Sequence, residues 1–128
     1  MKPLTREWVN KAEGDFATAS REMRARNAPN YDAACFHAQQ CIEKYLKALL
    51  QEAGVSFGRT HNLDSLVLPL LRSHPQWSAL RPALRELSAY AVQTRYPGES
   101  SDKDMAREAY SHCRKARAQF RLALKLER

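Results

Sequence analysis

The chain contains little glycine and proline, the residues whose abundance would argue against a helical globular protein. Its 128 residues include four Gly and six Pro, too few for a collagen-like, disordered or turn-rich β-sheet chain. The longest apolar stretch runs from Leu66 to Leu71 and contains Pro69, so it falls far short of the roughly 20 apolar residues that a membrane-spanning helix needs. The sequence therefore predicts one compact domain over residues 1–128, with no membrane span.

Cysteine is also scarce, with three residues at unrelated positions and no CxxC or HExxH motif. His37 and Cys41 lie four residues apart, hence on one helix face, but zinc normally takes three or four ligands. We therefore interpret the two as packed side chains. The amino terminus lacks the apolar core of a secretory signal. These absences predict reduced thiols, a cytoplasmic chain that begins near Met1, no metal site and no cofactor.

Acidic residues are outnumbered by basic ones. The chain has 21 Lys and Arg against 14 Asp and Glu, which gives a net charge of +7 and a pI of about 9.6. This imbalance favours contact with an anionic partner such as a nucleic acid. The basic residues are scattered along the chain, so an ordinary basic surface is an equally good interpretation.

Apolar residues recur at steps of three and four along most of the chain, which is the spacing of amphipathic helices. The alternation typical of a strand is absent beyond four residues. The sequence therefore predicts an all-α fold, an up-and-down antiparallel bundle of four main helices plus one short helix. The predicted helices cover residues 5–27, 31–53, 61–72 (the short one), 76–94 and 103–124.

Capping residues indicate where these helices begin and end. Asn30, Thr60 and Asp102 are the predicted N-caps, and Gly54 ends the second helix. Pro69 must bend or interrupt the short helix, because a proline removes one backbone hydrogen bond. The apolar face of the second helix is too wide for a single neighbour, which predicts that this helix lies at the centre of the bundle.

Polar residues of the second helix form a first candidate site. Gln40, Lys44 and Lys47 lie on neighbouring turns, and Glu43 lies one turn before Lys47, close enough to pair with it. Amide and ammonium groups placed in this way could hold a phosphate or a base edge. The alternative is a solvated, salt-bridged helix face, which the spacing alone favours.

Two further places offer an anion site. His61 stands at the predicted start of the short helix, where N–H groups and an imidazole could bind an anion, or where Thr60 is simply a cap with His61 beside it. Arg95 and Tyr96 follow the fourth helix, next to Pro97. Arg95 could complement the helix dipole while Tyr96 covers the core. Alternatively, the pair could bind a phosphate and stack on a base.

Taken in order, these motifs resemble the HEPN domain family over about residues 5–124. The resemblance rests on residues around Trp8 and Phe16, ACFHAQQ at 34–40, EKYLKA at 43–48, THNL at 60–63 and RYP at 95–97. It implies an all-α bundle that binds nucleotides and is frequently a homodimer. It also implies a minimal nucleotidyltransferase partner, encoded alongside it as a toxin–antitoxin pair.

Many members of this family are also metal-independent ribonucleases that use an arginine followed, after a short spacer, by a histidine. Arg95 stands where that arginine would be, but no histidine follows it before Asp102. Arg107 and His112 fit the bare spacing, yet they lie within the last predicted helix. Two residues five apart on a helix point about 140° away from each other, so we interpret this match as a coincidence.

Three functions remain open at this point. The first is a nucleotide- or RNA-binding module that acts with a nucleotidyltransferase partner. The second is a ribonuclease toxin in which His61 or His112 replaces the missing base beside Arg95. The third is a structural or partner-docking bundle without a ligand. The net charge and the missing histidine favour the first, whose predicted ligand-binding residues are Gln40, Lys44, Lys47, His61, Arg95 and Tyr96.

Overall fold

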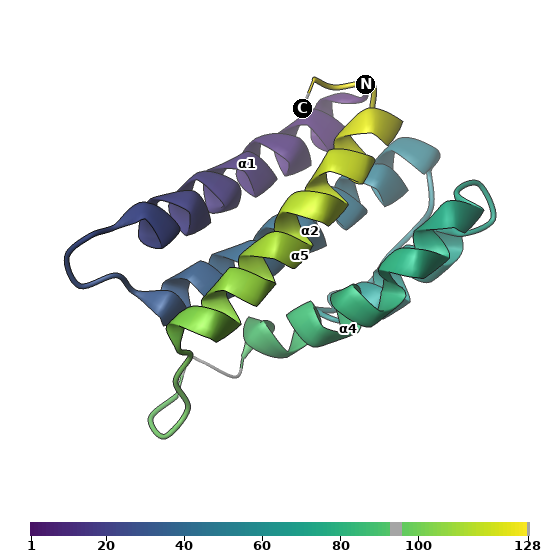
Figure 1. Ribbon diagram of the computed structural model, residues 1–128. Coiled ribbons are helices and arrows are strands. Elements are labelled where there is room, and N and C mark those ends of the chain that lie inside the picture. Colours follow the sequence, from purple (N-terminus) through teal and green to yellow (C-terminus); the bar gives the residue numbers. More distant parts are fainter. Residues whose placement is uncertain (93–95, 128) are drawn as a thin grey trace.

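The computed structural model describes residues 1–92 and 96–127, and every regular element in these ranges is helical. Three long helices lie alongside one another (Figure 1): α1 (Pro3–Arg24), α2 (Tyr31–Ala53) and α5 (Lys103–Ala123). Short α-helices and 3₁₀ helices (η) lie against α2 and α5: α3 (Leu63–Val67), η1 (Leu68–Leu70), η2 (Pro75–Leu80), α4 (Arg81–Ser88) and η3 (Ala89–Ala91). The predicted all-α bundle is confirmed.

The second helix, α2, lies at the centre of the bundle, as its wide apolar face predicts. It contacts α1, α3, α4 and α5, and it is buried along most of its length. Asn30 caps it, since the Asn30 side chain accepts a hydrogen bond from the Ala33 N–H at 2.9 Å. Gly54 ends it in the left-handed region, with a φ of 71°. Both predicted boundaries are confirmed, and so is the Asp102 cap of α5.

The predicted start of the third helix is wrong. Asn62 caps α3 instead of Thr60: the Asn62 side chain accepts a hydrogen bond from the Ser65 N–H at 3.1 Å. The Thr60 hydroxyl accepts from the Asn62 N–H, also at 3.1 Å, and so stabilises the preceding turn. The α-helix ends at Val67 and continues as η1 through Pro69, because proline cannot donate the hydrogen bond of a further α-helical turn.

The helix predicted over residues 76–94 is divided, and its last residues lie outside the described ranges. Pro75 and Pro82 stand in the first turns of η2 and α4, where a residue without an N–H is tolerated. The chain therefore forms a 3₁₀ turn, then α4, then η3. The first helix also differs slightly from the prediction, because α1 ends at Arg24 rather than near residue 27.

Large aromatic side chains and small residues fill the core. Trp77, Tyr45 and Phe120 are almost completely buried, and the rings of Trp77 and Phe120 meet edge-on with centroids 4.9 Å apart. All three cysteines are buried and free. Burial raises the pKa of Cys35 and of Cys41, which keeps these thiols protonated at neutral pH.

A charged cluster joins the three long helices. Glu13 on α1 accepts two hydrogen bonds from Arg117 on α5, at 2.8 and 2.6 Å, and one from the Tyr45 hydroxyl on α2 at 2.5 Å. Arg121 donates to the same hydroxyl at 2.8 Å. Burial alone would raise the pKa of Glu13, but hydrogen bonds from Arg117 and Tyr45 and the arginine charges lower it. The ionised carboxylate therefore fixes α1 against α2 and α5.

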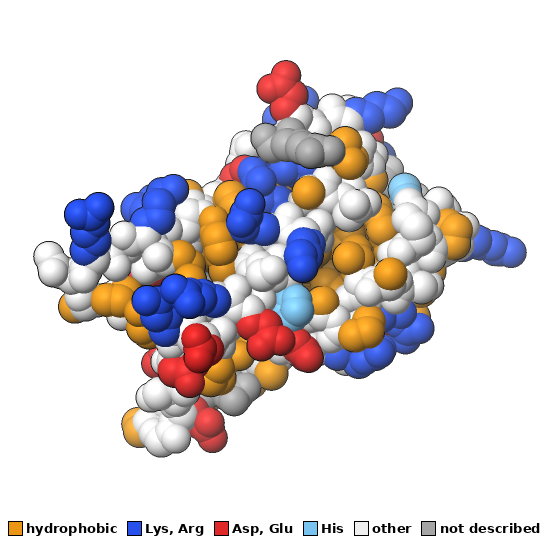
Figure 2. Space-filling model, in the orientation of Figure 1, with side chains coloured by type: hydrophobic (Ala, Val, Ile, Leu, Met, Phe, Trp, Pro, Cys, Tyr) orange, Lys and Arg blue, Asp and Glu red, His pale blue; other side chains and the backbone are white. Residues whose placement is uncertain are grey.

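The surface has no single basic region on the face shown in Figure 2. There, Lys and Arg side chains lie in several separate groups with hydrophobic side chains between them, which matches their scatter along the sequence. Within residues 1–92 and 96–127, none of the helices has both the length and the hydropathy that crossing a bilayer requires.

Replacing Gly14 and Gly54 with alanine should change stability in opposite directions. Gly54 has a φ of 71°, so G54A should lower the free energy of unfolding by about 1–2 kcal/mol. Gly14 lies on the exposed side of α1, with no atom within 4 Å of the position an added Cβ would take. G14A should therefore raise that free energy by about 0.5–1 kcal/mol. Urea unfolding measures both, and shifts of the same sign would contradict this explanation.

Candidate functional site

A buried polar network on α2 holds one exposed histidine. The carboxylate of Glu43 accepts hydrogen bonds from Gln39 Nε2 at 3.0 Å, Lys47 Nζ at 3.1 Å and His61 Nδ1 at 2.7 Å. Gln40 Nε2 donates to Gln39 Oε1 at 2.7 Å. We call these side chains, Gln39, Gln40, Glu43, Lys47 and His61, the Glu43 network. It brings three of the predicted ligand-binding residues together.

This network is costly to bury unless every polar group has a partner. Gln39 is 0% exposed, Glu43 4% and Lys47 8%. Burial alone would raise the pKa of Glu43, but hydrogen bonds from Gln39, His61 and Lys47 and the Lys47 charge lower it. Glu43 is therefore an ionised, buried carboxylate. The interpretation of Glu43 and Lys47 as a solvated face is wrong because both are buried, whereas their predicted pairing is confirmed.

Glu43 fixes the orientation of the His61 imidazole. An ionised carboxylate only accepts hydrogen bonds, so His61 Nδ1 carries the proton and Nε2 is the second ring nitrogen, free to act as acceptor or, when protonated, as donor. Among the described residues, Nε2 has no hydrogen-bond partner. The side chain of His61 is 59% exposed, and Gln39 Nε2 also donates to the His61 carbonyl at 3.3 Å. The network thus holds both the ring and the backbone of a solvent-accessible histidine.

A hollow of about 420 Å³ adjoins this imidazole. Arg85 on α4 also lines this hollow, and its side chain is 55% exposed. Arg85 contacts Asp64 at 3.3 Å, a carboxylate that Arg81 already binds through hydrogen bonds of 2.8 and 3.0 Å. We call this the His61 hollow, and its lining residues are His61, Asn62, Arg85, Ser88, Ala89, Ala91 and Val92.

Polar and apolar groups together suit a nucleotide. A guanidinium can donate to a phosphate, and an imidazole can do so through Nε2 when it is protonated, while the exposed side chains of Ala89 and Val92 offer an apolar surface for a sugar or base. Sequence reasoning missed Arg85 and the anchoring role of Glu43. Glu43, His61 and Arg85 come together only because α3 and α4 pack against α2. No spacing within the sequence could therefore have indicated their proximity.

Lys44 lies outside the Glu43 network. Its ammonium group donates to Asp15 on α1 at 2.6 Å, and the same carboxylate binds His37 Nδ1 at 2.7 Å. Lys44 and Lys47 therefore each have an internal carboxylate partner, which weakens their attraction for an external phosphate. The interpretation of His37 as a packed side chain beside Cys41 holds only for the cysteine, which is fully buried, while the imidazole is partly exposed and paired with Asp15.

Of the two residues predicted to form a site after the fourth helix, the structure describes Tyr96. Arg95 lies outside the described residues. Tyr96 is 64% exposed, and its carbonyl accepts a hydrogen bond from the Glu99 N–H at 3.3 Å across a tight turn. Gly98 in this turn has a φ of 92°. Tyr96 therefore does not cover the core, and its ring is available for stacking.

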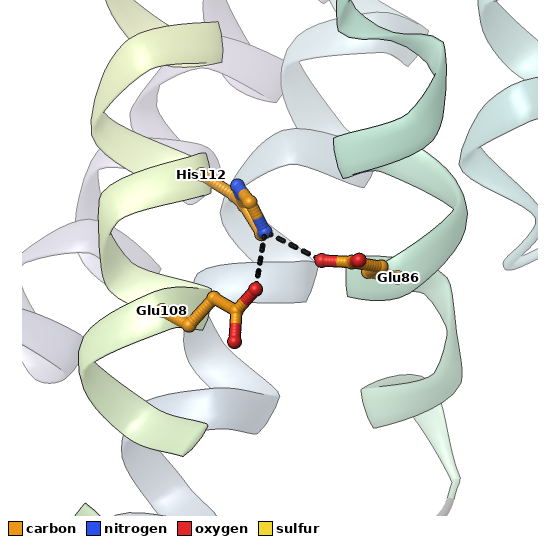
Figure 3. Close-up of side chains that lie close together, drawn as sticks. All are labelled: Glu86, Glu108 and His112. Carbon is orange, nitrogen blue, oxygen red and sulfur yellow. Dashed lines mark hydrogen bonds and ion pairs between the residues drawn. The ribbon is translucent and has the colours of Figure 1, made fainter. Parts of the chain in front are cut away.

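Among the described residues, His112 pairs with two glutamates and not with Arg107. Its Nε2 lies 2.8 Å from Glu86 Oε2 and 3.6 Å from Glu108 Oε1, as the dashed lines in Figure 3 show. The contact with Glu86 joins α5 to α4. The arginine–histidine spacing on α5 thus corresponds to no contact between Arg107 and His112, in keeping with its interpretation as a coincidence.

Three comparisons with known proteins each found a similar sequence or fold. The family model for the HEPN domain matches residues 5–120. A candidate toxin of Methanocaldococcus jannaschii, MJ1304, is 28% identical over 97 residues, which cover 70% of this chain but 61% of that protein. TT1696 from Thermus thermophilus has a TM-score of 0.76 at 25% identity, covering 91% of this chain and 94% of that one. The archaeal HEPN homologue ST0689 shares the fold, with a TM-score of 0.69 at 23% identity and coverage of 94% and 99%.

Proposed function

The chain belongs to the HEPN domain family, and on this premise we propose that it is a nucleotide- or RNA-binding module of a toxin–antitoxin pair. The naming of MJ1304 as a candidate toxin and the net charge of +7 support this function. The observation that carries the proposal is the His61 imidazole, which buried Glu43 holds beside Arg85 in the His61 hollow.

The phosphate of the ligand lies between His61 Nε2 and the Arg85 guanidinium in this proposal. Both side chains are more than half exposed, and among the described residues their internal contacts use only His61 Nδ1 and Arg85 Nη1, so their other nitrogen atoms can meet a ligand. Tyr96 and Arg95, adjacent in the sequence, supply base stacking and a second guanidinium. The remaining predicted residues act indirectly: Gln40 and Lys47 through the Glu43 network, and Lys44 through Asp15.

We also propose a minimal nucleotidyltransferase as the partner and a homodimer as the oligomeric state, both of which the family resemblance implies. The described helices pack around one cluster of buried side chains, which supports a single domain over residues 1–128. Co-expression with the neighbouring gene should yield a complex that purifies together. Light scattering that finds only a 14.6 kDa species would contradict the homodimer.

A ribonuclease toxin is the second candidate, and the Glu43–His61 contact of 2.7 Å favours it. A carboxylate that holds Nδ1–H leaves Nε2 as a general base. In the corresponding step, His61 Nε2 takes the 2′-hydroxyl proton, the 2′ oxygen bonds to phosphorus, and the bond from phosphorus to the 5′ oxygen breaks. The 5′ oxygen leaves with a proton from the imidazolium. RNA cleavage that is lost in H61A and kept in H112A would establish this candidate over simple binding.

Ligands of the binding module should stabilise the folded chain. A ligand that binds only the folded state contributes about 2.7 kcal/mol when present at 100 times its Kd. We therefore expect thermal shift measurements with AMP, ATP, GTP and a short single-stranded RNA to show a rise in Tm for at least one of them. If none of these ligands changes the Tm at millimolar concentration, the structural or docking bundle becomes the better interpretation.

A further inference from the structure

Two carboxylates and an imidazole meet between α4 and α5, outside the Glu43 network. Glu86 belongs to α4, while Glu108 and His112 lie four residues apart on α5 and point toward it (Figure 3). His112 Nε2 is 2.8 Å from Glu86 Oε2 and 3.6 Å from Glu108 Oε1. One donor atom from each of the three residues lies within 4.8 Å of the other two.

These carboxylates differ from the other paired acidic groups of the chain. Glu13, Glu43 and Asp64 each lie within ion-pair distance of a lysine or arginine. Glu86 and Glu108, among residues 1–92 and 96–127, have only the shared imidazole of His112. Two negative charges therefore face one side chain that is neutral unless protonated, and a cation bound there would balance them.

The cluster is also accessible and adjustable. Hollows of about 360 and 250 Å³ both include Glu86, Glu108 and His112 in their walls, which leaves room for water or a further ligand. Lys115 lines the larger hollow without reaching ion-pair distance of either carboxylate. The side chains of Glu86 and Glu108 are 61% and 64% exposed, so their ends can move to the spacing that a bound cation requires. Figure 2 shows acidic side chains beside a histidine on this face.

We propose that Glu86, Glu108 and His112 form a binding site for Zn²⁺. Zinc binds imidazole nitrogen and carboxylate oxygen at about 2.0–2.2 Å, which places tetrahedral donors about 3.3–3.6 Å apart. The His112–Glu108 distance of 3.6 Å already fits, and the His112–Glu86 hydrogen bond lengthens when the metal replaces its proton. The imidazole disfavours Mg²⁺ and Ca²⁺, which prefer oxygen ligands. Three protein ligands leave one position for water.

The bound ion would join α4 to α5 and stabilise the side of the bundle that α4 covers. No sequence motif indicates the site, because Glu86 lies on a different helix from the other two ligands, and the sequence predicted no metal at all. The site is independent of the proposed nucleotide binding, since it shares no residue with the His61 hollow.

Calorimetric titration with Zn²⁺ tests the site directly. The wild-type chain should bind about one equivalent, and H112A and E86Q should each bind at least about 100-fold more weakly. H61A is the matched control, because it removes another histidine paired with a glutamate and should retain the affinity. Co²⁺ should give the visible absorption of a tetrahedral site in the wild type and lose it in E86Q.

Circular dichroism must show that each variant is folded, because unfolded cysteines and histidines also bind zinc. E86Q changes an exposed side chain and should fold even if H112A does not. The proposal is overturned if the wild type binds no Zn²⁺ at millimolar concentration, or if folded E86Q and H112A bind it as tightly as the wild type does.

Discussion

Substitution of Glu43 by alanine should lower the free energy of unfolding by about 3–5 kcal/mol, the loss typical of removing one partner of a buried ion pair. The variant leaves Lys47, 8% exposed, without its carboxylate, and Gln39, 0% exposed, without an acceptor for one of its hydrogen bonds. It also releases the His61 ring. Urea unfolding at neutral pH measures the change in free energy.

The matched control is Glu7→Ala, which removes an exposed glutamate from α1 and should change the free energy of unfolding by no more than about 0.5 kcal/mol. If E43A and E7A have equally small effects, the Glu43 network does not stabilise the fold. That outcome would also remove the reason to regard His61 as held in place.

Two buried or partly buried carboxylates, Glu43 and Glu13, make stability depend on pH in a definite direction. The pKa of Glu43 and that of Glu13 are lowered from 4.5 in the folded chain. A carboxylate whose folded pKa is depressed contributes stability above its unfolded pKa, and this contribution is lost as the pH falls through the folded pKa. The wild type should therefore lose stability progressively below about pH 5, and E43A should lose less over the same range because one of the carboxylates with a lowered pKa is gone.

The parts of the fold that depend on local chemistry could be predicted from the sequence. Asn30 and Gly54 bound α2 as expected, since a side-chain cap and a left-handed glycine act within a few residues. The start of α3 was predicted wrongly because Thr60 and Asn62 are both good caps, and only the folded chain shows which one accepts the Ser65 N–H. Local preference alone does not decide between two adjacent caps.

The candidate site could be predicted only in part, for a related reason. The Glu43–Lys47 pair follows from the spacing of four residues on a helix. The contact from His61 to Glu43, and the position of Arg85 beside the same hollow, depend on how α3 and α4 pack against α2. The polar residues of α2 are typical of a solvated helix face, but several of them are buried. They form an internal network that positions the exposed His61 imidazole.

Loss of either His61 or Arg85 from the His61 hollow should weaken RNA binding strongly. A hydrogen bond to a charged group contributes about 1.5–3 kcal/mol, so H61A and R85A should each raise the Kd for a short single-stranded RNA about 10- to 100-fold. R85A should also reduce the salt dependence of log Kd by about 0.7, the share of one phosphate contact with a single strand. H112A and R107A are the matched controls on α5 and should bind as the wild type does.

Fluorescence anisotropy of a labelled RNA, titrated with these four variants and the wild type at two salt concentrations, is the most direct test of the His61 hollow as the anion-binding site. The predicted result is a selective loss of affinity in H61A and R85A, with circular dichroism spectra unchanged. Equal affinity in all five proteins, or a loss confined to H112A and R107A, would contradict it.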